Sequence, residues 1–230
     1  MYILHYAPDN ASLIVRLALE ELGLAYETRL VDRAVRAQDS AAYRRLNPAG
    51  LIPALETPEG PVFETGAILL WLSESHRALA PAPGSPDRAA FLKWLFFTSN
   101  TLHAEMRMLF YPDRYAGTEE TVPAFSAKTR DRIAGHLAIL DAMATGRPAW
   151  CRPETPSILT LYLSALIRWL ALYPTDTAGW FDLTAFPALH ALAAGMETRP
   201  TALRAASAEG LGETIFTAPG YANPPEGSAT

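Results

Sequence analysis

Cysteine, long hydrophobic runs and clusters of like charge are all scarce in this sequence. The 230 residues include one cysteine, Cys151, which excludes an internal disulfide bond and a metal site built from several thiolates. The most apolar stretch, Ile158–Leu172, is shorter than the roughly 20 residues that cross a bilayer, and polar side chains interrupt it. We therefore expect a buried helix there and no membrane-spanning segment.

Positive and negative charges are nearly balanced and are spread along the whole chain. With 19 Lys and Arg against 24 Asp and Glu, the formal net charge is −5, which argues against nucleic acid as the main partner. The segment Met1–Tyr6 lacks the basic residues and cleavage site of a secretory signal, so we expect a cytoplasmic protein. Hydrophobic residues make up 50% of the chain, enough to bury a sizeable core.

The first third of the chain alternates strand and helix patterns. The short apolar segment Tyr2–Tyr6 predicts a strand, and apolar residues at helical spacing from Ser12 onward predict a helix that Gly23 ends. The following patterns predict a strand at 26–31, a polar stretch to 46, a strand hairpin at 54–63 and a helix to His76. The predicted order is βαβαββα.

The composition changes after the first third of the chain. Residues 78–86 contain three prolines and one glycine, which predicts an extended linker. Strand signals then disappear, and apolar periodicity predicts helices at 87–110, 122–144, 157–172 and 186–198. We expect an α/β domain at 1–77, a linker at 78–86, an all-helical domain at 87–215 and a loose tail at 216–230.

Two motifs carry most of the functional information. Residues 47–55 read Asn-Pro-Ala-Gly-Leu-Ile-Pro-Ala-Leu, and residues 63–68 read Phe-Glu-Thr-Gly-Ala-Ile. In this order and at this separation they resemble the glutathione S-transferase family, in particular its bacterial, beta- or theta-like cytosolic members. The resemblance implies a thioredoxin-like glutathione-binding domain, an all-helical substrate-binding domain and glutathione as co-substrate. It also implies a homodimer and a role in detoxification.

The resemblance assigns these motifs to glutathione. Pro53 stands at the start of a strand, one of the few places where a sheet tolerates proline, and family context indicates a cis bond after Ile52. The backbone of Ile52 would then bind the cysteinyl unit, with Leu51 and Pro53 beside it. Glu64 and Thr65 stand at a helix start, where free N–H groups and the helix dipole favour a carboxylate. This pair would hold the γ-glutamyl end.

The sequence departs from the family at the position that activates the thiol. Ala11 stands where beta-class members carry cysteine, which excludes a cysteine mechanism. A thiol has an ordinary pKa of about 8.5, so a transferase needs a donor that stabilises the thiolate. We rank Ser12 first as a hydroxyl that caps the first helix, Tyr6 second and Asn10 third. Each has a structural alternative, as a cap, a core aromatic residue or a turn residue.

A second departure concerns the glycyl carboxylate of glutathione. Leu51 stands where family members often place Gln, Lys or His. The substitutes that lie nearby in the sequence are Gln38, Arg44 and Arg45.

In the second domain, four polar residues recur at three- and four-residue spacing: Asn100, His103, Arg107 and Tyr111. By resemblance, this helix lines the electrophile pocket, so we expect His103, Arg107 and Tyr111 to contact substrate. A solvated helix face is the simpler alternative. No residue lies at metal-ligand spacing from His103, so we expect no metal site.

Together these features predict a transferase that conjugates the glutathione thiolate to small apolar electrophiles. A glutathione-dependent isomerase or reductase is one alternative, because the same motifs serve several chemistries. A non-catalytic protein that binds glutathione or another ligand is the other, motivated by Ala11 and Leu51.

Overall fold

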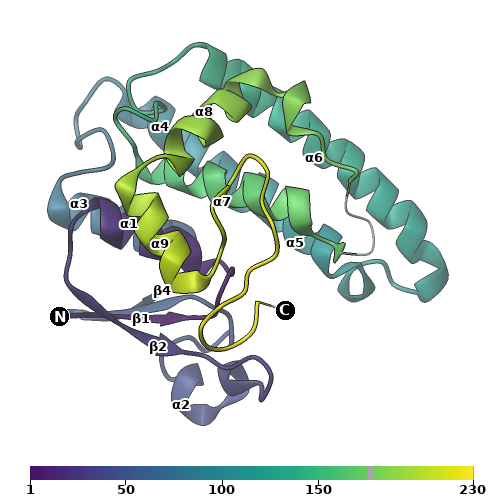
Figure 1. The fold of residues 1–230 in the computed structure, drawn as a ribbon, viewed down its shortest axis with the longest axis horizontal. Coiled ribbons are helices and arrows are strands. Elements are labelled where there is room, and N and C mark those ends of the chain that lie inside the picture. Colours follow the sequence, from purple (N-terminus) through teal and green to yellow (C-terminus); the bar gives the residue numbers. More distant parts are fainter. Residues whose placement is uncertain (176–178, 230) are drawn as a thin grey trace.

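A computed structural model describes residues 1–175 and 179–229, so residues 176–178 of the expected helical domain and residue 230 of the expected tail lie outside the description. Figure 1 shows a small sheet with helices at one end of the molecule and a larger group of helices above it. The predicted fold class, a thioredoxin-like α/β domain followed by an all-helical domain, is confirmed.

The first domain has the predicted βαβαββα order. Its elements are β1 (Tyr2–Tyr6), α1 (Ser12–Glu21), β2 (Tyr26–Leu30), α2 (Ala41–Arg44), β3 (Ala54–Thr57), β4 (Gly60–Phe63) and α3 (Thr65–His76). The strand order is β2-β1-β3-β4, with β1 parallel to β2 and β3 antiparallel to both of its neighbours. Because His5 pairs with Ala54 and Ala54 pairs with Phe63, the end of β1, the start of β3 and the end of β4 share one edge.

The second domain contains α4 (Arg88–Phe97), a π-helical turn (Thr98–Leu102), α5 (His103–Phe110), α6 (Val122–Thr145), α7 (Ile158–Leu172), α8 (Pro187–Glu197) and α9 (Pro200–Glu209). The helix predicted at 87–110 is thus interrupted by a π turn, and α9 was not predicted. Helix α9 packs against α1, which joins the two ends of the chain (Figure 1).

Helix α7 forms the centre of the core. All of its residues except Ala171 are buried, which confirms the buried helix predicted for Ile158–Leu172. It packs against α1, α3 and α8 and so contacts both domains. Within the described ranges, no helix has the length and apolar character needed to cross a membrane.

The expectation of a loose tail is wrong. Residues 216–229, here called the C-terminal strap, run back across the molecule as the yellow segment of Figure 1. Arg168 donates to the carbonyl of Gly220 (3.0 Å), the Tyr221 hydroxyl donates to Leu172 O (3.1 Å), and Arg33 donates to Ala229 O (2.8 Å). The composition correctly indicates a lack of helix and strand, but side-chain donors elsewhere fasten the backbone.

Candidate active site between the two domains

The shared sheet edge carries the first candidate residues. The Ile52–Pro53 peptide bond is cis, as predicted. Among the described residues, neither the N–H nor the C=O of Ile52 has a hydrogen-bond partner. An unpaired donor and acceptor on adjacent atoms can bind an extended peptide as a strand would.

Glu64 and Thr65 lie across from Ile52 and Pro53, because the pairing of Ala54 with Phe63 brings the residues beyond each strand together. Helix α3 begins at Thr65, and Glu64 is its N-cap residue with φ 68° and ψ 115°. Such a conformation costs a non-glycine residue about 1–3 kcal/mol and is concentrated at functional sites.

The first turn of α3 leaves donors available. Ile68 N donates to Glu64 O (2.9 Å), so the N–H groups of residues 65–67 have no partner within the helix. Among the described residues, no hydrogen bond engages the Thr65 hydroxyl or the exposed Glu64 carboxylate. Free N–H groups, a hydroxyl and the positive end of the helix dipole together form an anion site.

The segment before Pro53 is held rigidly. Leu51 O accepts hydrogen bonds from the Tyr43 hydroxyl and from Asn47 Nδ2, both at 2.7 Å. Gly50 has φ +64°, and a Cβ there would lie 3.1 Å from Arg44 Nη2, so this position requires glycine. The Leu51 side chain remains 37% exposed.

Gln38, Arg44 and Arg45, the three residues suggested for the glycyl carboxylate of glutathione, differ in whether their polar groups are already engaged. Arg44 is engaged by Asp39 (2.9 Å) and Pro48 O (3.0 Å). Gln38 Oε1 is buried without a hydrogen-bond donor. Arg45 is exposed and has no ion-pair partner among the described residues. Arg45 is therefore the substitute whose charge is free.

Ser12 does not occupy the position expected of it. The helix N-cap is Ala11, and Ser12 lies inside α1 with 0% exposure. Its hydroxyl donates to Ala7 O (3.0 Å) and accepts from Ala7 N (3.2 Å). The expectation of a capping Ser12 is wrong, because the hydroxyl closes the turn between β1 and α1 and has no donor left for a thiolate.

The hydroxyl of Tyr6 is also engaged. It donates to Glu226 Oε1 in the C-terminal strap (2.5 Å), and the residue is 3% exposed. Burial raises the pKa of Tyr6 above its ordinary value, the bond to Glu226 and its charge raise it further, and Arg16 beneath the ring lowers it. A group with a raised pKa and a carboxylate partner is poorly suited to stabilise a second anion.

Asn10 retains a free donor. Its Oδ1 accepts from Ala11 N (2.8 Å) and its carbonyl accepts from Leu13 N (2.7 Å), whereas no described residue accepts from Nδ2. The side chain is partly exposed in the turn after β1, at the shared sheet edge. Asn10 therefore retains a side-chain donor that Ser12 does not.

A buried polar cluster beside Asn10 was not predicted. Asp9, with φ 48°, accepts hydrogen bonds from Arg168 Nε (2.8 Å) and Nη2 (2.9 Å) and from Trp169 Nε1 (2.8 Å). Its N–H donates to Glu209 Oε2 (2.8 Å), and Glu209 pairs with Arg16 (2.7 Å). Burial raises the pKa of Glu209 to about 7, against the opposing effect of Arg16. The sequence does contain one signal of this cluster: Arg168 lies inside an otherwise apolar helix, and a buried arginine requires a partner.

His103 faces the boundary between the domains. Its Nδ1 lies 2.8 Å from the Tyr162 hydroxyl, and its ring lies 5.9 Å from that of Trp169. Burial lowers the pKa of His103 to about 4, and the charge of Arg107 adds to the effect, so the imidazole is neutral near pH 7. Burial raises the pKa of Tyr162, and the charge of the Glu64 carboxylate adds to this rise.

The other residues of the expected stripe lie further out. Arg107 Nε donates to the Tyr115 hydroxyl (3.1 Å), and Tyr111 ends α5 with 37% exposure. Asn100 is exposed in the π turn, where its Oδ1 accepts from Ser99. The π turn adds a residue to one helical turn, so the predicted spacing does not keep all four residues on one face.

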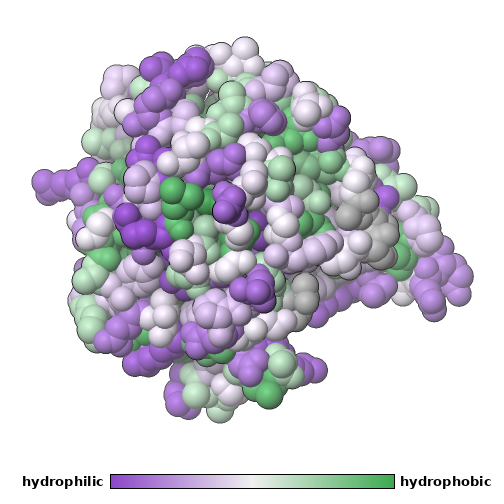
Figure 2. Space-filling view, viewed as in Figure 1, coloured by the Kyte–Doolittle hydropathy of each residue, from purple (hydrophilic) through white to green (hydrophobic). Residues whose placement is uncertain are grey.

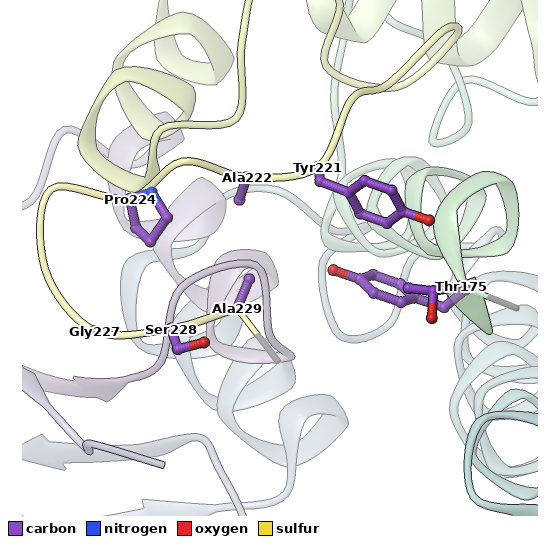
Figure 3. Close-up of a pocket in the computed structure, with 8 residues that line it drawn as sticks. Thr175, Tyr221, Ala222, Pro224, Gly227, Ser228 and Ala229 are labelled. Carbon is purple, nitrogen blue, oxygen red and sulfur yellow. The ribbon is translucent and has the colours of Figure 1, made fainter. Parts of the chain in front are cut away.

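The C-terminal strap encloses a pocket of about 280 Å³. Figure 3 shows Tyr221 and Thr175 on one side of it and Pro224, Gly227 and Ser228 on the other. A Cβ on Gly227 would lie 2.7 Å from Leu30 at the end of β2. This part of the pocket therefore lies beside β2, whereas Ile52 precedes β3, and β1 separates these two strands.

No group of three or more His, Cys, Asp or Glu side chains within residues 1–175 and 179–229 could hold a metal ion. The single cysteine, Cys151, is buried, and burial raises its pKa to about 12.

Comparison with known proteins identifies relatives across both domains. A family model described as the glutathione S-transferase N-terminal domain matches residues 11–75. Glutathione S-transferase GST-4.5 of Xanthomonas campestris pv. campestris is 28% identical over 189 residues, which cover 80% of this chain and 89% of the relative. GstA of Escherichia coli O157:H7 is 28% identical over 213 residues, which cover 90% of this chain and 98% of the relative.

A solved structure gives the same result. A sphingomonad glutathione S-transferase, solved in complex with glutathione, is 33% identical and has a TM-score of 0.73. The alignment covers 91% of this chain and 100% of that protein. The similarity therefore extends well beyond the α/β domain.

Proposed function

This chain belongs to the glutathione S-transferase family and is a glutathione transferase, and we propose that it conjugates the glutathione thiolate to small apolar electrophiles. The observation that carries the proposal is the sheet edge, where the unpaired backbone of Ile52 faces the free first turn of α3. One site binds peptide backbone and the other binds a carboxylate, and glutathione contains both groups.

Glutathione would lie along this edge. The N–H and C=O of Ile52 bind its cysteinyl unit, while the Thr65 hydroxyl and the N–H groups of residues 65–67 bind the γ-glutamyl carboxylate. The Glu64 carboxylate pairs with the γ-glutamyl amino group. Leu51 and Pro53 shape the edge, and Arg45 supplies the charge for the glycyl carboxylate.

The thiol activator in this proposal is Asn10. Its Nδ2 group and the N–H of Ser12, which has no intrahelical partner, are the free donors at the start of α1. Both could donate a hydrogen bond to a thiolate at the helix N-terminus, where the helix dipole would stabilise the negative charge further. One well-placed donor to a developing anion changes the rate by about 10²–10³.

The electrophile would enter between the domains. His103 and Tyr162 form a neutral pair there, and Arg107 and Tyr111 lie towards the outer end of α5. A neutral imidazole and phenol tolerate an apolar substrate better than charged groups would.

Titration calorimetry with reduced glutathione tests binding, and a chlorodinitrobenzene assay then tests transfer. Thr65→Val removes the hydroxyl at the anion site and should weaken glutathione binding about tenfold or more. Thr184→Val, a change at an exposed hydroxyl in the second domain, is the matched control. Binding without turnover on any electrophile would favour the isomerase, reductase or non-catalytic alternatives.

We also propose a homodimer. Figure 2 shows hydrophilic residues spread across the face that carries the strap, with small hydrophobic areas between them. Exposed large hydrophobic side chains occur at Leu51 (37%) in the segment before β3, at Phe63 (37%) in β4 and at Phe96 (48%) in α4. Burial of these side chains would favour self-association. Light scattering should give a dimer mass that Phe96→Glu reduces to a monomer, and a monomeric wild type would refute the proposal.

A further inference from the structure

Asp9 is buried, and both its carboxylate and its backbone N–H are hydrogen-bonded to residues of the second domain. Both carboxylate oxygens accept from Arg168, one also accepts from Trp169, and the Tyr173 hydroxyl lies 3.5 Å from the other. Its backbone N–H is held by Glu209. A bidentate pair fixes orientation as well as distance.

The donors that hold the Asp9 carboxylate come from the helical domain. Arg168 and Trp169 are neighbours on α7, and the side chains of Arg168 and Asp9 are both 0% exposed. Arg168 also donates to Ile215 O and Gly220 O, so the same guanidinium fastens the strap. A fully buried ion pair is weak evidence for net stability, because desolvation offsets the attraction. Its clearer effect is to hold Asp9 at φ 48°.

Asp9 directly precedes the proposed thiol donor. A residue at positive φ sets the direction in which the chain leaves it, and the next residue is Asn10. The Trp169 ring also lies 5.9 Å from the ring of His103 on α5. The pair therefore sets the position of the α1 start relative to the helical domain.

We propose that Asp9 is a positioning residue for thiol activation: held by Arg168 and Trp169, it aims the Asn10 amide and the first turn of α1 at the sulfur. This role rests on the proposed function. Asp9 itself is no donor and contacts no substrate. Misplacement of a catalytic group by about 1 Å can reduce a rate by roughly 10²-fold.

The test compares Asp9→Asn with Glu21→Gln. Glu21 is held by Arg199 Nε (2.6 Å) and Nη2 (2.9 Å), so it makes an equivalent bidentate pair between the domains at the other end of α1. Asp9→Asn should weaken glutathione binding only as far as the lost stabilisation of the thiolate accounts for, while kcat falls at least tenfold and the pKa of the bound thiol, followed by thiolate absorbance, rises. Glu21→Gln should lower the melting temperature without changing kcat or the thiol pKa.

Trp169→Phe provides a milder variant if Asp9→Asn does not fold, since it removes only the indole donor to Asp9 and keeps a ring beside His103. It should give a smaller change of the same kind. If wild type binds no glutathione, the proposed function and this role both fail. If wild type binds glutathione and turns over, but both Asp9→Asn and Trp169→Phe change only the melting temperature, the positioning role alone is refuted.

Discussion

The two ends of α1 make the same kind of contact with the helical domain but in different surroundings. At the N-terminal end, the side chains of Asp9 and Arg168 are completely buried, and Trp169 donates a further hydrogen bond to Asp9. At the C-terminal end, the side chain of Arg199 is 25% exposed beside a buried Glu21. The first pair lies beside the proposed thiol donor, and the second lies at the opposite end of α1. The comparison sets an ion pair that we propose positions a catalytic group beside one for which we propose only a structural role.

The largest difference should appear when each arginine is removed. Arg168→Met leaves Asp9 buried without a counter-charge and should lower the free energy of unfolding by about 3–5 kcal/mol. Arg199→Met should cost about 1–2 kcal/mol, because solvent reaches this pair and can partly replace the lost contacts. Urea denaturation of both variants measures the difference. Equal losses would show that burial does not distinguish the two ends.

The next effect concerns the rate at the N-terminal end. Asn10→Ala should lower kcat by about 10²-fold, because it removes a donor to the developing thiolate. Ser12→Ala is the matched control two residues later, and it should reduce stability while kcat per folded molecule stays near wild type, since its hydroxyl is spent on Ala7. A large loss of kcat in Ser12→Ala alone would restore the assignment made from the sequence.

Acid should lower the stability of the folded protein through His103. Its pKa is lowered from 6.5 to about 4, so below pH 6.5 the unfolded chain binds a proton that the folded protein does not. The free energy of unfolding should therefore fall between pH 6.5 and about 4, by at most about 3 kcal/mol. His103→Phe should lose this pH-dependent contribution and keep the ring contacts. Identical pH profiles for both proteins would contradict a neutral His103.

The smallest effect is expected at the strap. Glu226→Gln weakens the bond to Tyr6 and should cost about 1 kcal/mol, with kcat unchanged because the proposed thiol donor is Asn10 and not Tyr6. The pKa of Tyr6 should move towards its ordinary value, which ultraviolet titration of tyrosinate can follow. Glu213→Gln, an exposed carboxylate just before the strap, is the control. An increase in kcat would instead indicate that Glu226 restrains Tyr6.

Local patterns predicted most of the fold. The βαβαββα order and the start of α3 near Thr65 follow from short segments and their spacing, whereas the cis bond before Pro53 was predicted from the resemblance to the family. The π turn at 98–102 was missed because it keeps the composition of a helix and changes only the hydrogen-bond register.

The site was harder to predict because its contacts join distant residues. Ser12 has the composition of a helix cap, but its hydroxyl turns back to Ala7, which only the turn geometry reveals. Arg168 signals a buried partner, yet nothing local identifies Asp9, 159 positions away. The composition of residues 216–230 predicts a loose tail, because the side chains that donate to its backbone, such as Arg168 and Arg33, lie elsewhere in the chain.

The most direct test of the account is the pKa of the glutathione thiol in the bound state, followed by thiolate absorbance in wild type, Asn10→Ala and Tyr6→Phe. We expect a value well below the ordinary one of about 8.5 in wild type and in Tyr6→Phe, and a return towards it in Asn10→Ala. A thiol pKa that is unchanged by Asn10→Ala and restored by Tyr6→Phe would contradict thiol activation at the N-terminal end of α1.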